Sequence, residues 1–101
     1  VEIEAQTADG NTRKLSADVL LVATGRGPVT AGLGAEDIGL QMEKGYIKVD
    51  EMYRTSVANI SAIGDVITLA SPGHPQLAHV SSMEGVLVAE RLAGQEVQPL
   101  N

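Results

Sequence analysis

The first residues of the chain alternate between apolar and polar side chains. Positions 1, 3 and 5 hold Val, Ile and Ala, whereas positions 2 and 4 hold Glu; this period of two is typical of a strand with one buried face. Asp9-Gly10 follows, a dipeptide that favours the tight turn of a β-hairpin. A second, solvated strand is expected around residues 12–15. The pattern therefore predicts an antiparallel hairpin at the start of the chain.

Residues 19–23 form a continuous apolar run, Val-Leu-Leu-Val-Ala, that ends at Thr24-Gly25. A short run of this kind, rich in β-branched residues and stopped by a glycine, predicts a strand buried on both faces. The glycine-rich stretch over residues 25–45 indicates loop structure. Two more short strands are predicted, one over residues 46–50 and one over residues 59–63, the second ending at Gly64-Asp65.

A helix is predicted near residues 76–92. Apolar residues recur there at spacings of three and four, which is the pattern of an amphipathic helix: Leu77, Ala78, Val80, Met83, Val86, Leu87, Ala89 and Ala93. The polar residues Ser81, Ser82, Glu84, Glu90 and Arg91 lie mostly off that stripe. Pro75 suits the first helical position and Gly94 the C-terminal cap. Gly85 inside the helix indicates close approach to a sheet or a ligand.

Composition and charge exclude several classes of protein. The 101-residue chain has a formal net charge of −6, whereas a nucleic-acid-binding surface needs clustered basic residues. It contains no cysteine, which excludes disulfides and thiolate metal sites, and we predict no metal site. No apolar run approaches the roughly 20 residues that span a bilayer, and no signal peptide is recognised. We therefore expect a cytoplasmic location and no membrane association.

Three segments together carry a resemblance to a known family. Residues 17–28 (ADVLLVATGRGP) are similar to the ATGR-x-P segment of the flavoprotein pyridine nucleotide-disulfide oxidoreductases, and residues 54–66 (RTSVANISAIGDV) are similar to their second FAD motif. Residues 75–85 resemble the helix that follows in the dihydrolipoamide dehydrogenases of that family. The order and spacing of the three segments make the resemblance specific.

The resemblance implies an α/β fold that is a fragment of a two-dinucleotide FAD/NAD(P)-binding fold, with antiparallel strands, then short strands and one long C-terminal helix. Residues 1–28 would be the last strands of the NAD-domain-like part, and residues 29–101 the return segment of the FAD domain. The complete enzyme would pass electrons from dihydrolipoamide to NAD through a disulfide and FAD. The chain lacks both the C-x-x-x-x-C pair and a G-x-G-x-x-G turn, so we expect the isolated chain to be inactive.

The resemblance also implies a partial FAD site without a catalytic residue. Asp65 would accept hydrogen bonds from ribityl hydroxyls and Gly64 would let the backbone approach the cofactor, although Gly-Asp is also a common turn. Gln76, Leu77 and Ala78 would face the flavin with their backbone at a helix start, and Gly25 would lie close to a cofactor. Arg26 is equally compatible with a surface salt bridge, and neither His74 nor His79 is predicted to be catalytic.

The expected partner is the rest of the parent flavoenzyme, itself expected to be a homodimer, or a second copy bound through exposed apolar surface. The chain has two tyrosines and no Phe or Trp, a composition that suits a segment packing against another body, because large aromatic side chains usually dominate a core. Two alternatives stay open. One is another flavoenzyme of the same architecture, such as a mercuric reductase or an NADH oxidase. The other is a noncatalytic association module derived from such an enzyme.

Overall fold

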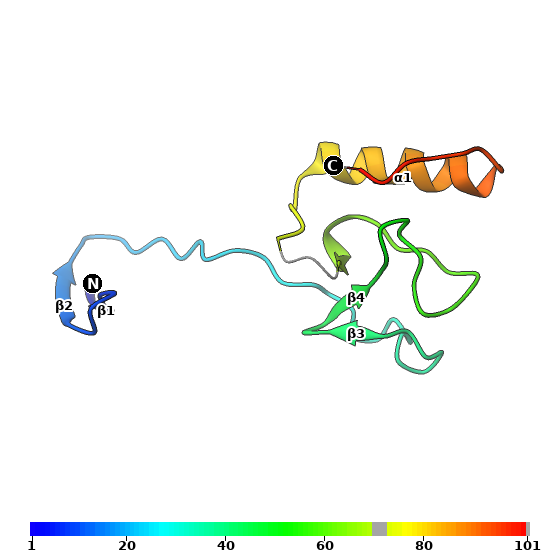
Figure 1. Cartoon of the computed structure of the whole chain (residues 1–101). Coiled ribbons are helices and arrows are strands. Elements are labelled where there is room, and N and C mark those ends of the chain that lie inside the picture. Colours follow the sequence, from blue (N-terminus) through cyan, green and yellow to red (C-terminus); the bar gives the residue numbers. More distant parts are fainter. Residues whose placement is uncertain (70–72, 101) are drawn as a thin grey trace.

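The computed structural model describes residues 1–69 and 73–100. An N-terminal hairpin stands at one end, an extended segment follows it, and a larger part with short strands and one helix lies at the other end (Figure 1). This separation gives the chain an elongated shape, with principal extents of 58 × 31 × 26 Å. Among the described residues, no helix has both the length and the apolar character needed to cross a membrane.

The predicted N-terminal hairpin is confirmed. Strand β1 (Glu2–Gln6) pairs antiparallel with β2 (Thr12–Ser16), and Ile3 lies opposite Leu15. The turn contains Gly10 at a positive φ of 87°, a conformation that favours glycine. Asp9 accepts a hydrogen bond from the Asn11 backbone N–H at 3.3 Å, so local turn chemistry sets the register that the sequence pattern predicts.

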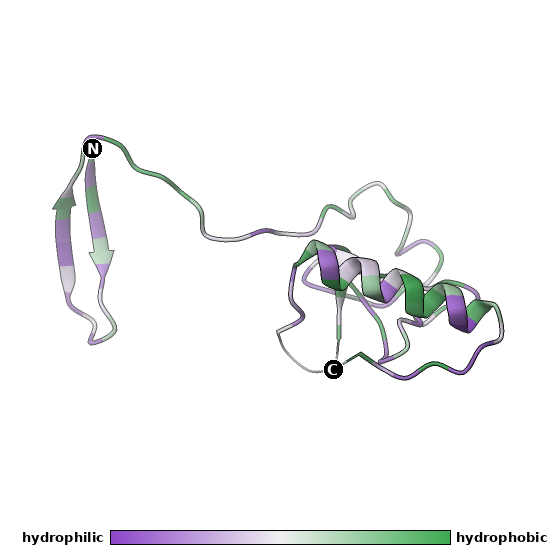
Figure 2. Ribbon diagram, turned by 90° about the horizontal axis from the view of Figure 1, so that it is seen from above, coloured by the Kyte–Doolittle hydropathy of each residue, from purple (hydrophilic) through white to green (hydrophobic). Residues whose placement is uncertain are grey.

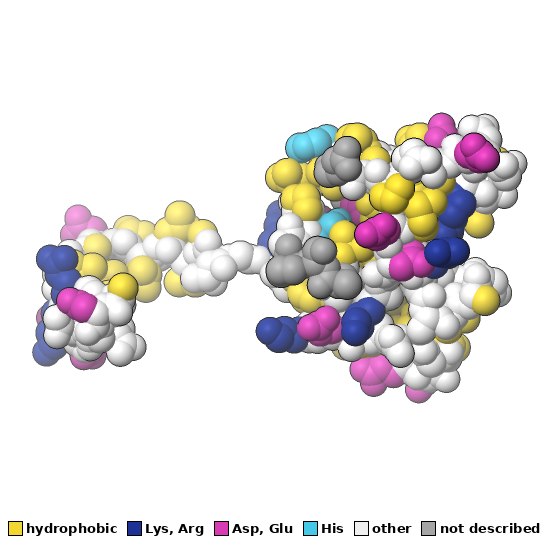
Figure 3. Space-filling model, in the orientation of Figure 1, with side chains coloured by type: hydrophobic (Ala, Val, Ile, Leu, Met, Phe, Trp, Pro, Cys, Tyr) yellow, Lys and Arg dark blue, Asp and Glu magenta, His cyan; other side chains and the backbone are white. Residues whose placement is uncertain are grey.

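The predicted buried strand over residues 19–23 is wrong. The chain has no strand from residue 17 to residue 30, and the side chains of Val19 and Leu21 are 80% and 83% exposed. A buried strand needs neighbouring strands to satisfy its backbone and cover its faces, and no described residue pairs with this segment. Figure 2 shows the segment as a hydrophobic stretch beyond the hairpin, and Figure 3 shows hydrophobic side chains gathered along it.

A small mixed sheet forms the base of the larger part. Strand β4 (Tyr46–Lys48) lies between β3 (Met42–Glu43), to which it is antiparallel, and β5 (Ile67–Thr68), to which it is parallel. Lys44 and Gly45 connect β3 to β4 with positive φ values of 51° and 83°, as in the tight turns that favour hairpins. The strand predicted over residues 46–50 is therefore present in shorter form.

The strand predicted over residues 59–63 is reduced to a single bridge between Arg54 and Ser61. After it comes a 3₁₀ turn, η1 (Gly64–Val66), which leads directly into β5. The predicted order of antiparallel strands, short strands and a C-terminal helix is confirmed.

Helix α1 (Ala78–Leu92) confirms the predicted long helix, although it begins two residues later than expected and Pro75 lies before its first turn. Gly94 has a positive φ of 87° and its N–H donates to the Arg91 carbonyl, as expected for a C-terminal cap. The helix covers a core built from Ile47, Val49, Tyr53, Ile67 and Leu87.

The buried face of α1 differs from the predicted stripe. Glu84 is completely buried, whereas Met83 and Val86, both on the predicted apolar stripe, are 53% and 57% exposed. The helix is therefore rotated about its axis relative to the expectation. The physical reason is that polar residues on the inward face have partners from other parts of the chain, so their burial leaves no unsatisfied group.

Candidate functional site

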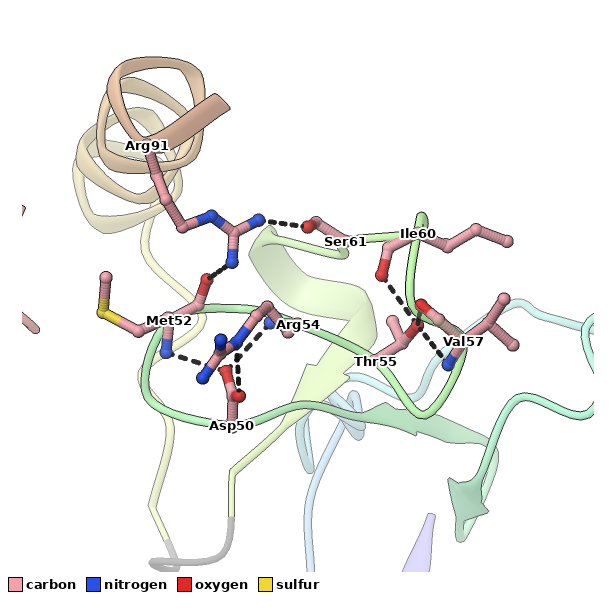
Figure 4. Close-up of polar contacts among 8 residues, drawn as sticks. All are labelled: Asp50, Met52, Arg54, Thr55, Val57, Ile60, Ser61 and Arg91. Atoms are coloured by element: carbon pink, nitrogen blue, oxygen red, sulfur yellow. Dashed lines mark hydrogen bonds and ion pairs between the residues drawn. The ribbon is translucent and has the colours of Figure 1, made fainter. Parts of the chain in front are cut away.

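The RT motif holds a tight loop beside the sheet (Figure 4). The Asp50 carboxylate accepts hydrogen bonds from the Arg54 backbone at 3.0 Å and from Arg54 Nε at 2.8 Å. Partial burial raises the pKa of the Asp50 carboxyl, but the hydrogen bonds from Arg54 and Met52 outweigh it and hold the pKa below its ordinary value. Thr55 Oγ1 donates to the Ile60 carbonyl at 2.7 Å. Both motif residues therefore shape the loop that leads to Gly64.

Arg91 ties this loop to the helix. Its guanidinium donates to the Met52 carbonyl at 2.8 Å and to Ser61 Oγ at 2.6 Å, and thus contacts both sides of the loop (Figure 4). A planar guanidinium can hold two acceptors in fixed directions. The last turn of α1 is thus fastened to the segment that immediately precedes Gly64-Asp65.

Gly64 lies against the first turns of the helix. Its φ is +83°, and a Cβ at this position would lie 3.4 Å from Ser81 Oγ. Both the left-handed backbone and the short distance favour glycine. Gly64 therefore lies close to helix α1, whereas its approach to a cofactor stays a prediction.

Asp65 presents a partly exposed carboxylate beside this contact. Its side chain is 45% exposed, and its Oδ2 lies 4.0 Å from Nη1 of Arg26, whose side chain is 78% exposed. The salt-bridge interpretation of Arg26 thus has a counterpart, but exposed pairs of this kind stabilise a fold only weakly. The carboxylate keeps most of its capacity to accept hydrogen bonds from another molecule.

Gln76 connects Asp65 to the start of the helix and to the sheet. Its Nε2 donates to the Asp65 carbonyl at 3.4 Å and to the Tyr46 hydroxyl at 3.3 Å. The Tyr46 hydroxyl in turn donates to the Arg26 carbonyl at 3.3 Å. Arg26, Asp65 and Gln76, three positions taken from separate motifs, are therefore brought together through Tyr46. The alternating pattern of residues 46–50 predicts a strand but contains no signal for this role of its first residue.

The remaining predicted site residues are Leu77, Ala78 and Gly25. Leu77 is the N-cap of α1 and Ala78 its first residue, so both stand at the helix start as expected. Gly25 has a φ of +125°, but a Cβ built there would meet no atom within 4 Å. The approach of Gly25 to a cofactor stays a prediction, and the adjacent Arg26 takes part in the contacts described above.

A polar cavity of about 340 Å³ adjoins Gln76. It is lined by Tyr46, Ile67, Thr68, Gly73, His74 and Gln76. Hydroxyl, imidazole and amide groups on its wall can each form hydrogen bonds with a small ligand. The cavity therefore offers polar contacts beside the Asp65 carbonyl and the helix start.

His74, on the wall of the cavity, forms a buried ion pair or hydrogen bond with Glu84. His74 Nε2 lies 3.1 Å and 3.3 Å from the two Glu84 oxygens, and the two side chains are 8% and 0% exposed. Burial raises the pKa of the nearby Tyr53 phenol, and the negative charge of Glu84 raises it further. The helical pattern predicts Glu84 on the solvated face. It does not reveal the buried position, because the partner His74 lies before the helix.

The start of α1 favours a negatively charged or electron-rich group. The first N–H groups of a helix have no partner within it, and the helix dipole is positive there. Leu77 makes no side-chain cap, and the first turn carries no acidic residue. Elsewhere in the described ranges, no group of three or more His, Asp or Glu residues could hold a metal ion.

Comparison with known proteins gives a consistent result. A family model described as pyridine nucleotide-disulphide oxidoreductase matches residues 1–85. The dihydrolipoyl dehydrogenase of Geobacillus stearothermophilus is 50% identical over 88 residues, which cover 86% of this chain and 18% of that protein. The dihydrolipoyl dehydrogenase of Haloferax volcanii is 41% identical over 98 residues, which cover 96% of this chain and 20% of that protein.

A solved structure shares the fold. LpdA from Mycobacterium tuberculosis matches with a TM-score of 0.73 and 31% identity, and the match covers 97% of this chain and 20% of LpdA. The chain thus spans about a fifth of the length of the relatives that it matches. These matches confirm the resemblance and the α/β fold class expected from the three motifs, and the chain belongs to the pyridine nucleotide-disulphide oxidoreductase family.

Proposed function

We propose that the chain supplies part of the FAD site of a dihydrolipoyl dehydrogenase-like flavoenzyme. The main support is the geometry of Gly64-Asp65, which turns against the first residues of α1 and leaves the Asp65 carboxylate 45% exposed. A ribityl chain carries hydroxyl donors, and an ionised carboxylate accepts their hydrogen bonds strongly. Arg26 at 4.0 Å is itself exposed, so it can move aside or bind a neighbouring oxygen without a large loss of stability.

The start of α1 supplies the second part of the proposed site. Gln76, Leu77 and Ala78 would face the pyrimidine edge of the flavin with their backbone N–H groups, where negative charge on the reduced cofactor is stabilised by the helix dipole. FAD, when bound, supplies the electron-transfer chemistry, and the protein groups bind it and tune it. Gly25 is proposed to approach the cofactor only when the connecting segment is covered by the rest of the enzyme.

The two parts of the chain correspond to two proposed domains. Residues 1–28 would be the last strands of the NAD-domain-like part and residues 29–101 the return segment of the FAD domain. The separation of β1 and β2 from the larger part supports a boundary in the connecting segment. In the complete enzyme, NAD would accept the electrons that dihydrolipoamide delivers through a disulfide and FAD.

The isolated chain is proposed to be inactive, because it contains no cysteine and no G-x-G-x-x-G turn. Another disulfide reductase or an NADH oxidase of the same family is the alternative parent. The exposed apolar side chains of Val19 and Leu21 favour the second alternative, a noncatalytic module that associates with the rest of such an enzyme or with its own copies. The cytoplasmic location and the homodimeric state of the parent enzyme stay predictions.

The proposed site can be tested by titrating the ¹⁵N-labelled chain with FAD up to millimolar concentration and following amide resonances. Perturbations are expected at Gly64, Asp65, Gln76, Leu77 and Ala78, with a dissociation constant well above the micromolar range because the pyrophosphate-binding turn is missing. No oxidation of NADH by a dye acceptor is expected in the same preparation. Micromolar binding together with turnover would show that the chain is a functional module by itself.

Two variants that each remove one negative charge distinguish a specific role of Asp65 from a general effect of charge. Asp65→Asn is expected to abolish the localised perturbations, since the amide accepts hydrogen bonds more weakly than a carboxylate. Asp37→Asn removes the same charge from a loop remote from Gly64 in the sequence and is expected to leave them unchanged. Equal behaviour of the two variants would reject a specific role for Asp65.

A further inference from the structure

The contacts around Tyr46 form a closed ring. Gln76 Nε2 carries two protons, which reach the Tyr46 hydroxyl at 3.3 Å and the Asp65 carbonyl at 3.4 Å. Tyr46 then donates its own proton to the Arg26 carbonyl at 3.3 Å. The Arg26 guanidinium closes the ring 4.0 Å from the Asp65 carboxylate.

The direction of donation is fixed in the three hydrogen bonds of this ring, since the acceptors at Asp65 and Arg26 are backbone carbonyls. Tyr46 accepts one hydrogen bond and donates another, and chains of this kind strengthen each member by polarisation. Gln76 has no other arrangement that serves both acceptors, because its carbonyl oxygen cannot donate. The ring therefore specifies one relative position for the connecting segment, η1 and the approach to α1.

Tyr46 is the member of the ring that lies in a strand of the small sheet. It opens β4, the central strand of the small sheet, and the next residue, Ile47, is 5% exposed in the core. Ile47 lies opposite Ile67, which follows η1 directly. The hydroxyl is thus held at a fixed position relative to Asp65, whereas Arg26 and Gln76 lie on irregular segments.

We propose that Tyr46 is a positioning residue for the flavin site, acting through Gln76 and Arg26 to set the distance between the Asp65 carboxylate and the start of α1. The inference rests on the proposed function, since it concerns the groups that would contact FAD. Tyr46 itself does not need to touch the cofactor.

The test uses Tyr46→Phe in the ¹⁵N-labelled chain, first without FAD. Loss of the hydroxyl is expected to shift the amide of Gly27, which shares a peptide group with the Arg26 carbonyl, and the side-chain amide of Gln76. Gln76→Leu removes the ring from the other side and should shift the amides of Gly27 and Val66. Tyr53→Phe is the matched control, because Tyr53 belongs to the core cluster and should leave all three signals in place.

The second measurement adds FAD. Tyr46→Phe is expected to raise the dissociation constant about 2- to 10-fold, the scale of one neutral hydrogen bond, while core amides such as Leu87 keep their positions. Unchanged signals of Gly27 and Gln76 without FAD would overturn the ring itself. Shifted signals with unchanged FAD binding, while Asp65→Asn abolishes binding, would overturn the positioning role alone. No effect of Asp65→Asn would overturn the flavin site and this inference together.

Discussion

Nε2 of His74 lies 3.1 Å from the carboxylate of Glu84, although His74 precedes the helix and Glu84 lies in its middle. The Glu84 side chain is completely buried, and a buried carboxylate is costly without a partner. The contact therefore allows α1 to turn a polar residue inward. It also fixes the segment that carries Gln76 and Leu77 against the helix, so the proposed flavin contacts depend on it.

Replacement of His74 by alanine should destabilise the chain strongly. Removing His74 leaves the buried Glu84 carboxyl without its partner, and breaking a buried pair in this way typically costs roughly 3–5 kcal/mol. The free energy of unfolding in urea, followed by circular dichroism, measures the loss. His79→Ala is the matched control, because His79 is exposed on the first turn of the helix, and a change within about 0.5 kcal/mol is expected for it. An equal loss of unfolding free energy in the two variants would show that the His74–Glu84 contact does not stabilise the fold.

Alkaline pH should weaken the fold through Tyr53. Burial first, and then the charge of Glu84, raise the pKa of this phenol above its ordinary value of 10.0. The unfolded chain therefore loses the phenolic proton at a lower pH than the folded chain. The corresponding stability is complete below about pH 10 and is lost as the pH rises through the folded-state value. In urea titrations at several pH values, Tyr53→Phe should remove this part of the alkaline loss and Tyr46→Phe should retain it.

Two glycines, Gly64 beside the helix and Gly85 within it, should respond in opposite directions to replacement by alanine. Gly64 has a φ of +83°, so Gly64→Ala is expected to cost about 1–2 kcal/mol. Gly85 is helical, and its added Cβ would lie 3.3 Å from Ile63 Cδ1, the end of a side chain that is 37% exposed and can rotate away. Gly85→Ala should therefore gain up to about 1 kcal/mol. Thermal unfolding measures the change in stability of the two variants. Destabilisation by Gly85→Ala would mean that the Ile63 side chain cannot rotate away from the added methyl group.

Local sequence patterns predicted the elements that are determined by interactions between residues close together in the sequence. The hairpin follows from alternation and the Asp9-Gly10 turn, and α1 follows from its period and its Gly94 cap. Each signal lies within a few residues of the structure that it specifies. Gly64 has the left-handed backbone that favours glycine, but the ligand that the sequence predicts beside it lies outside what local signals can establish.

Contacts between distant residues were not predictable in the same way. The inward face of α1 depends on partners outside the helix: His74 pairs with Glu84, and Met52 and Ser61 accept hydrogen bonds from Arg91. Helical periodicity contains no information on these partners. Tyr46 meets Arg26 and Gln76 across separations of 20 and 30 residues, and nothing in the strand pattern indicates it. The run over residues 19–23 has the composition of a buried strand, but composition alone does not provide the neighbouring strands that bury it.

The exposed apolar segment should cause self-association. Val19 and Leu21 are 80% and 83% exposed, and an extended apolar segment with free backbone groups is a template for strand pairing. Val19→Thr combined with Leu21→Ser should lower the mass measured by light scattering toward that of the monomer. Val29→Ser is the control, because Val29 is 91% exposed but lies outside the apolar run. Retention of the larger mass in the double variant would place the association surface elsewhere.

The proposed role of Asp65 in a complete enzyme can be tested in a chimera. The dihydrolipoyl dehydrogenase of Geobacillus stearothermophilus is 50% identical to this chain over 88 residues, and its matching part can be replaced by this sequence. If the proposed function is right, the chimera should retain FAD and oxidise dihydrolipoamide with NAD. Asp65→Ala in the chimera should weaken FAD retention by about 1.5–3 kcal/mol, the scale of a charge-assisted hydrogen bond, or roughly 10- to 150-fold. Asp37→Ala controls for the loss of charge. A chimera that folds and keeps FAD equally well with either variant would assign the Gly64-Asp65 turn to the fold and not to the cofactor.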